Sequence, residues 1–163
     1  MNEVQLIRAQ LGLERQHAVD VARSLAELSP VEPFRQTAVE YLAWVLSRFE
    51  ERDQVFHDLL RSRFPAADDP NRRAAEAALT LPGSSRDALA KLETALRSAS
   101  SGGSAWQDFQ HFFTGAWSTR RDEIDRLFER QAKVTDWRTV SGIDADSIVD
   151  ERGRYARVSA ARP

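Results

Sequence analysis

The chain has 163 residues, no cysteine, and 23 basic against 25 acidic side chains, which gives a formal net charge of −2. Its length is typical of one domain, and without thiols it can form no disulfide, thiolate metal site or cysteine nucleophile. Proteins that bind nucleic acid or anionic membranes usually carry a clear excess of basic residues, so neither partner is expected here.

No apolar run approaches the roughly 20 residues that a membrane-spanning helix needs. The amino-terminal residues also lack the basic, apolar and small-residue regions of a signal peptide, so we expect a cytoplasmic protein. The basic side chains are almost all arginine, with Lys91 and Lys133 the only lysines, and alanine is abundant. That usage is typical of a GC-rich bacterial coding sequence.

Apolar residues recur every three or four positions along most of the chain, and no sustained alternation predicts a strand. This spacing predicts a first helix over about 2–28, which ends at Ser29-Pro30. A second helix is expected from near Pro33, a residue suited to a first helical turn, to about Phe64.

Beyond the second helix, Asp69 can cap and Pro70 can open a short helix over 71–79. Ser84 or Ser85 is then expected to cap a third main helix, which leads into a serine- and glycine-rich connector.

That connector spans 98–104 and is followed by a fourth main helix over about 105–134. Asp144 can cap a short helix that continues to about Tyr155, and the last residues are expected to be frayed.

Four amphipathic helices with short connections predict an all-α fold, an antiparallel up-down four-helix bundle. The bundle would carry a short extra helix between the second and third main helices and a short C-terminal helical tail. The chain is predicted to be a single domain over 1–163, with its core over about 2–134 and a docked tail over 135–163.

Three ionisable side chains lie where the helical periodicity predicts buried apolar residues. Glu14 interrupts the apolar stripe of the first helix, Asp53 that of the second and Arg120 that of the fourth. A buried charge without a partner is strongly destabilising, so such groups are normally paired, bound to a metal or functional. Folding the first two helices together brings Glu14 close to Arg52. The sequence therefore predicts a core network of two ion pairs, Glu14–Arg52 and Asp53–Arg120, with a ligand pocket formed by the same four residues as the alternative.

Three parts of the chain are similar to a known helical family. His17 lies in the first helix, the segment RFEERDQVF (48–56) in the second and the segment TRRDEIDRLF (119–128) in the fourth. With the helix layout, they resemble the hemerythrin-like (HHE cation-binding) bundle over roughly residues 13–128. The resemblance implies a four-helix bundle around a di-iron centre whose ligands are histidines and carboxylates.

The chain departs from that family's pattern at most ligand positions. Phe49 stands where the second-helix histidine should precede Asp53, and the third helix has no histidine. The residues that a metal centre could still use are Glu14, His17 and Asp53. Their helical phase is poor, because His17 lies about 70° from the centre of the apolar stripe of its helix.

Trp44 lies about 130° from the apolar stripe of the second helix. It must therefore be covered by another helix or by the C-terminal tail, and an exposed tryptophan there would mark an interface. This position is the candidate contact for a homodimer or for another protein partner.

The leading hypothesis is a non-enzymatic hemerythrin-like bundle that acts as a binding or regulatory module, with the charge network in place of the di-iron site and no cofactor. The alternative is a cation-binding or oxygen-handling hemerythrin-like protein that holds iron at a nonstandard site. No nucleophile elbow, phosphate-binding glycine loop or dinucleotide fingerprint occurs in the sequence, so no catalytic residue is assigned.

Overall fold

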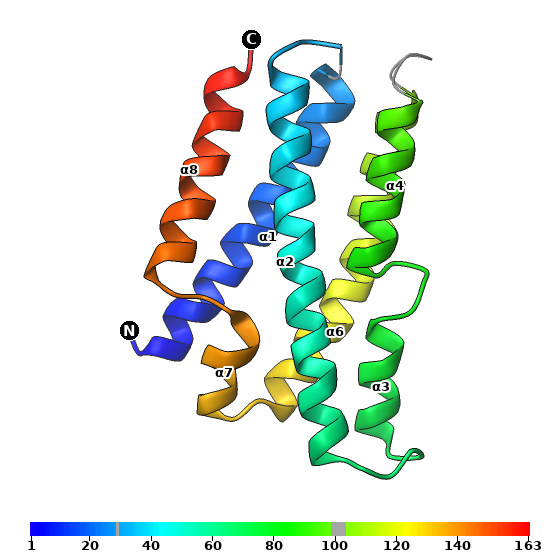
Figure 1. Cartoon of the computed structure of the whole chain (residues 1–163), viewed down its shortest axis with the longest axis vertical. Coiled ribbons are helices and arrows are strands. Elements are labelled where there is room, and N and C mark those ends of the chain that lie inside the picture. Colours follow the sequence, from blue (N-terminus) through cyan, green and yellow to red (C-terminus); the bar gives the residue numbers. More distant parts are fainter. Residues whose placement is uncertain (29, 99–103) are drawn as a thin grey trace.

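The computed structural model describes residues 1–28, 30–98 and 104–163, and within these ranges it contains helices and no strand (Figure 1). Helix makes up 83% of the structure, which confirms the predicted all-α class. None of the described helices combines the length and the apolar composition that a membrane-spanning segment requires. The elements in chain order are α1 (Glu3–Leu28), α2 (Phe34–Arg63), α3 (Pro70–Ala78), α4 (Ser85–Arg97), α5 (Ser104–Phe112), the π-helical turn η2 (Phe113–Trp117), α6 (Ser118–Gln131), α7 (Val134–Ser141) and α8 (Ala145–Ala161).

Local capping residues set where three of these helices begin. Asp69, Ser84 and Asp144 each accept a hydrogen bond from a backbone N–H a few residues further on, at the starts of α3, α4 and α8. These side-chain oxygens satisfy N–H groups that the first turn of a helix leaves without an intrahelical partner. The predicted extra helix before the third main helix and the predicted helical tail are both present.

The tail is a longer element than predicted. α8 continues to Ala161 instead of ending near Tyr155, and Val158 within it is buried. Arg162 forms an ion pair with Asp20 of α1, which holds the end of the tail against the rest of the molecule. The prediction of a frayed end is wrong, because contacts with residues far away in the sequence stabilise this segment.

The predicted fourth main helix is continuous through α5, η2 and α6, and it ends at Gln131 rather than near residue 134. Its middle turn, Phe113–Trp117, is π-helical. A π turn contains more residues than an α turn, so every later side chain is rotated around the helix axis. The connector predicted over 98–104 lies mostly outside the described residues.

α2 lies at the centre of the molecule and packs against α1, α3, α4 and α8 (Figure 1). α3 and α4 follow each other along one side of α2, and α8 lies along the opposite side. α5 contacts both α1 and α4. α7 contacts α1 and α2 near the end of α6.

The core consists of two separate apolar clusters. The larger is built from α1, α2, α4, α5, η2 and α8 and includes Leu42 and Trp117. The smaller is built from the start of α1, the end of α2, and α3, α6 and α7, and it includes Phe56 and Phe128. On three helices the residues between the two clusters are charged and buried: Glu14 on α1, Arg52 and Asp53 on α2, and Arg121 on α6. We call these four residues the charged layer.

Candidate functional site

The first ion pair of the charged layer joins α1 to α2, as the sequence predicted. Glu14 is fully buried, and its Oε2 lies 2.6 Å from Nη1 of Arg52. Its other oxygen, Oε1, lies 3.6 Å from Nη2 of Arg48, so one carboxylate serves two guanidinium groups. Nε of Arg52 donates a hydrogen bond to the backbone carbonyl oxygen of Ser141 on α7. Burial lowers the pKa of Arg52, Glu14 raises it, and Arg48 and Arg121 lower it further, with a net lowering.

The second ion pair joins α2 to α6, but its arginine is Arg121 and not Arg120. Nη1 of Arg121 donates to Oδ1 of Asp53 at 2.8 Å, and both residues are buried. Arg120 is partly exposed and pairs instead with Glu123 of its own helix at 2.9 Å. The predicted pair Asp53–Arg120 is therefore wrong by one position.

The η2 turn is the physical reason for this shift. The periodicity of the fourth main helix predicts an inward stripe of Phe109, Phe113, Ala116, Arg120, Ile124 and Leu127, and the buried positions follow it up to Phe113. Beyond it, Trp117 is buried and Ala116 is exposed, and Arg121 rather than Arg120 faces Asp53. The extra residue of the π turn rotates the side chains that follow it, so the inward position passes from Arg120 to Arg121, while Ile124 and Leu127 are buried as predicted.

Burial and charge act in opposite directions on the Asp53–Arg121 pair. Burial lowers the pKa of Arg121, but Asp53 and Asp125 outweigh that effect, and the pKa is raised. Burial raises the pKa of Asp53, and Arg121 counteracts this only in part. Arg121 also donates from Nε to Oδ1 of Asp125 at 2.9 Å, so one guanidinium serves two carboxylates.

The three residues suggested as metal ligands do not come together. Glu14 faces Arg52 and Asp53 faces Arg121. His17 contacts α8, where its Nδ1 lies 2.7 Å from Oε1 of Glu151. Among the residues that the structure describes, no group of three or more histidine, aspartate or glutamate side chains is arranged to hold a metal ion.

A second buried carboxylate, which the sequence reasoning missed, fixes α8 to α1 and α2. Glu151 is fully buried, and its Oε1 accepts a hydrogen bond from the hydroxyl of Tyr41 at 2.8 Å as well as contacting His17. The ring of His17 stacks on that of Tyr155 at a centroid distance of 3.7 Å. The signal was present, because Glu151 lies between Ile148 and Tyr155 at helical spacing, as Glu14 does between the apolar residues of α1.

Trp44 is half-buried and is covered by the tail, one of the two arrangements expected for it. The guanidinium carbon of Arg154 on α8 lies 4.7 Å from its ring centroid, and that of Arg48 lies at 4.9 Å. Both distances are typical of cation–π contacts. An interface at Trp44, and the homodimer that it would form, stay predictions.

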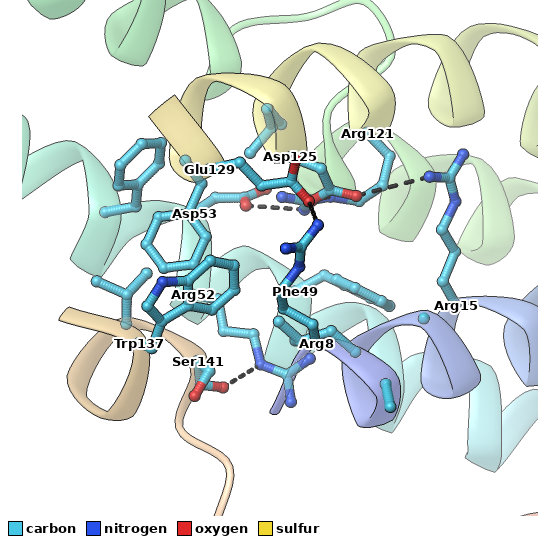
Figure 2. A pocket seen from close by; sticks show the side chains of 17 residues that line it. Arg8, Arg15, Phe49, Arg52, Asp53, Arg121, Asp125, Glu129, Trp137 and Ser141 are labelled. Carbon is cyan, nitrogen blue, oxygen red and sulfur yellow. Dashed lines mark hydrogen bonds and ion pairs between the residues drawn. The ribbon is translucent and has the colours of Figure 1, made fainter. Parts of the chain in front are cut away.

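A cavity of about 410 Å³ adjoins the charged layer between α1, α2, α6 and α7 (Figure 2). Arg52, Asp53 and Arg121 of the layer line it. Four aromatic rings contribute to its apolar wall, namely Phe49, Phe56, Phe128 and Trp137. Three of these rings are in contact, since the centroid of Phe128 lies 4.9 Å from that of Phe56 and 4.5 Å from that of Trp137.

Two arginines of α1 reach across the cavity to acidic residues of α6. Nη2 of Arg8 lies 2.6 Å from Oε1 of Glu129, and Nη1 of Arg15 lies 2.7 Å from Oδ1 of Asp122 (Figure 2 shows Arg8, Arg15 and Glu129). The Arg8–Glu129 pair is about half exposed on both sides, and such pairs contribute little to stability. This pair can therefore separate at small cost in free energy.

Comparisons of the chain with protein-family models, with curated proteins and with solved structures find no match. The resemblance to the hemerythrin-like family therefore stays a prediction. The chemical properties of the site follow from the cavity, its aromatic wall and the charges beside it.

Proposed function

We propose that this protein is a binding module that holds a small organic molecule in the cavity between α1, α2, α6 and α7. In this proposal the chain is an up-down helical bundle of the hemerythrin-like kind, and the charged layer occupies the place of a di-iron centre. No catalytic role is assigned to any residue. The observation that supports the proposal is one cavity that is lined both by four aromatic rings and by buried, ion-paired side chains.

The size and the lining of the cavity favour a small-molecule ligand. Pockets for such ligands usually measure about 300–1,000 Å³ and are mostly apolar, with a few charged or polar groups in fixed positions. Here the fixed groups are Arg52, Asp53 and Arg121, which are held by ion pairs and are nearly excluded from solvent. Side chains that are already oriented lose little conformational freedom when a ligand binds, and this favours affinity.

Filling the cavity is the direct test of this function. Gly12 lines the cavity within α1, and a Cβ atom built on it would meet no atom within 4 Å. We expect Gly12→Phe to place a ring in the cavity and to weaken ligand binding at least tenfold, while the fold is kept. Phenylalanine also has a higher helix propensity than glycine, so stability should be equal or slightly higher.

Gly153 provides the matched control. It too lies within a helix, α8, with open space around its Cβ position, and it does not line the cavity. Gly153→Phe should leave binding unchanged. Titration calorimetry with 4-phenylbutyrate, 4-phenylbutyramide and 4-phenylbutylamine measures binding, and circular dichroism verifies the fold. If none of the three compounds binds the unsubstituted protein, or if both variants bind equally well, the proposed function is wrong.

Metal content separates this function from the iron-binding alternative. We expect protein purified from iron-supplemented cells to be colourless and to contain far less than one iron per chain, because Glu14, His17 and Asp53 each contact a different partner. Elemental analysis and an optical spectrum measure this. Near-stoichiometric iron with an oxo-bridge charge-transfer band would contradict the proposal and favour the alternative.

A further inference from the structure

Every charged side chain that lines the cavity already has a partner of opposite charge. The lining contains four arginines and three carboxylates, and each of the four arginines contacts at least one carboxylate. The pairs are Arg8–Glu129, Arg15–Asp122, Arg15–Asp125, Arg52–Glu14, Arg121–Asp53 and Arg121–Asp125. Arg48 also contacts Glu14, so within the described residues five arginines face five carboxylates, and the group as a whole carries no net charge.

The two arginines of the charged layer are fully engaged by the protein itself. Nε of Arg52 donates to a backbone carbonyl oxygen of α7, and its Nη1 lies 2.6 Å from Oε2 of Glu14. Burial lowers the pKa of Arg121, but Asp53 and Asp125, to which it donates, outweigh that effect and raise it. A carboxylate ligand would have to displace one of the protein's own carboxylates from an arginine, and an amine would have to displace an arginine from a carboxylate.

Burial disfavours an added charge of either sign beside this layer. Burial raises the pKa of Asp53, and Arg121 counteracts this only in part. Burial also lowers the pKa of Arg52, and Glu14 counteracts this only in part. A negative and a positive charge are thus each less favourable here than in water, even with a partner at hand. A charged head group would lose its hydration in the same surroundings and would find no unpaired counter-charge to compensate for the loss.

The rings that line the cavity suit an aromatic body. Phe128 lies between Phe56 and Trp137, with centroid distances of 4.9 and 4.5 Å. Aromatic rings pack well against one another in offset or edge-to-face arrangements, and each buries a large apolar area. At about 30 Å³ for each water-sized group, the cavity volume corresponds to on the order of a dozen non-hydrogen atoms. One ring with a short substituent is a molecule of that size.

Resting on the function proposed above, we propose that the ligand is an uncharged molecule with an aromatic body. Its ring packs on Phe56, Phe128 and Trp137, and a neutral polar group can lie beside the ion pairs without separating any of them. The ion-paired lining discriminates against carboxylates and amines alike, because neither finds a free charge of opposite sign in the cavity.

Three compounds of similar shape test the required charge. At pH 7 the head group of 4-phenylbutyrate is anionic, that of 4-phenylbutyramide is neutral and that of 4-phenylbutylamine is cationic. In calorimetry with the full chain, we expect the amide to bind at least tenfold more tightly than either charged compound. A smaller difference between the amide and either of them would overturn the assignment of an uncharged ligand while leaving a small-molecule site. Absence of binding by all three would overturn both proposals.

Breaking one ion pair of the lining tests the reason for this preference. Glu129→Gln leaves Arg8 unpaired at the cavity, and Arg8→Gln leaves Glu129 unpaired there. The pair is about half exposed, so neither variant should lose much stability. Each variant supplies the counter-charge that the unsubstituted lining lacks. We expect Glu129→Gln to raise the ratio of acid to amide affinity at least threefold, and Arg8→Gln to raise the ratio of amine to amide affinity by a similar factor.

The pair Arg120–Glu123 provides matched controls, because it lies on α6 and does not line this cavity. Glu123→Gln and Arg120→Gln make the same changes in charge as the two cavity variants, and both should leave the affinity ratios unchanged. Circular dichroism verifies the fold of all four variants. If the cavity variants leave the ratios unchanged, or if the controls alter them as much, the paired charges do not set the specificity and the proposal is wrong.

Discussion

Arg121→Ala should lower the free energy of unfolding by about 3–5 kcal/mol, the range found when one partner of a buried ion pair is removed. The reason is that Asp53 is left buried, at 3% exposure, without the guanidinium that lies 2.8 Å away. Urea denaturation followed by circular dichroism measures the change. Asp53→Ala in the same chain should recover much of the loss, because the two substitutions act on one interaction and are not additive.

Arg120→Ala is the control for this prediction, since it removes the same side chain from the neighbouring position. Arg120 pairs with Glu123, which is more than half exposed, so its loss should change the free energy of unfolding by less than about 1 kcal/mol. A similar loss of stability in both variants would show that Arg121 is not the inward-facing cation. A coupling energy near zero between Arg121 and Asp53 would contradict the ion pair itself.

The second large effect is expected at the contact between α8 and the rest of the molecule. Glu151→Ala should lower the free energy of unfolding by about 2–5 kcal/mol, because it leaves the buried hydroxyl of Tyr41 and the imidazole of His17 without their acceptor. Burial and then Glu151 raise the pKa of Tyr41, so this hydroxyl remains a donor. Glu151→Gln keeps one acceptor oxygen and should cost less than the alanine variant.

Asp150→Ala is the matched control on the same helix. Asp150 pairs with Arg154 one turn away, and both side chains are partly exposed, so the expected change is below about 1 kcal/mol. Hydrogen exchange of the α8 amides should rise in Glu151→Ala and stay unchanged in Asp150→Ala. If Glu151→Ala is as stable as the control, α8 is not held by this carboxylate.

The sequence by itself determined most of the helices, because their signals are local. A capping side chain and the N–H that it binds lie within three residues of each other, so Asp69 and Asp144 could be assigned without knowledge of the fold, and Ser84 as one of two adjacent serines. The pair Glu14–Arg52 could also be predicted from the sequence. α1 and α2 are regular helices joined by a short connection, so the direction and height of each side chain follow from its position along the helix.

That Arg121 rather than Arg120 faces the core depends, by contrast, on a single π turn in the middle of a helix. Residue types give no clear signal for a π turn, because its energy depends on how Phe113 and Trp117 pack against other helices as well as on its own hydrogen bonds. One such bond runs from the hydroxyl of Ser118 to the carbonyl of Phe113, five residues earlier. Counting at a constant angle per residue therefore selected Arg120.

The cavity was decided entirely by tertiary structure. Phe49, Phe128 and Trp137 come from three helices, and each is by itself an ordinary apolar residue of an amphipathic stripe. They surround a cavity because α7 closes one end of the molecule and because Arg8 and Arg15 join α1 to α6 through long side chains. Periodicity shows which face of a helix is buried. The distance between two helices depends on how all their side chains pack together, and no local pattern of residues contains that information.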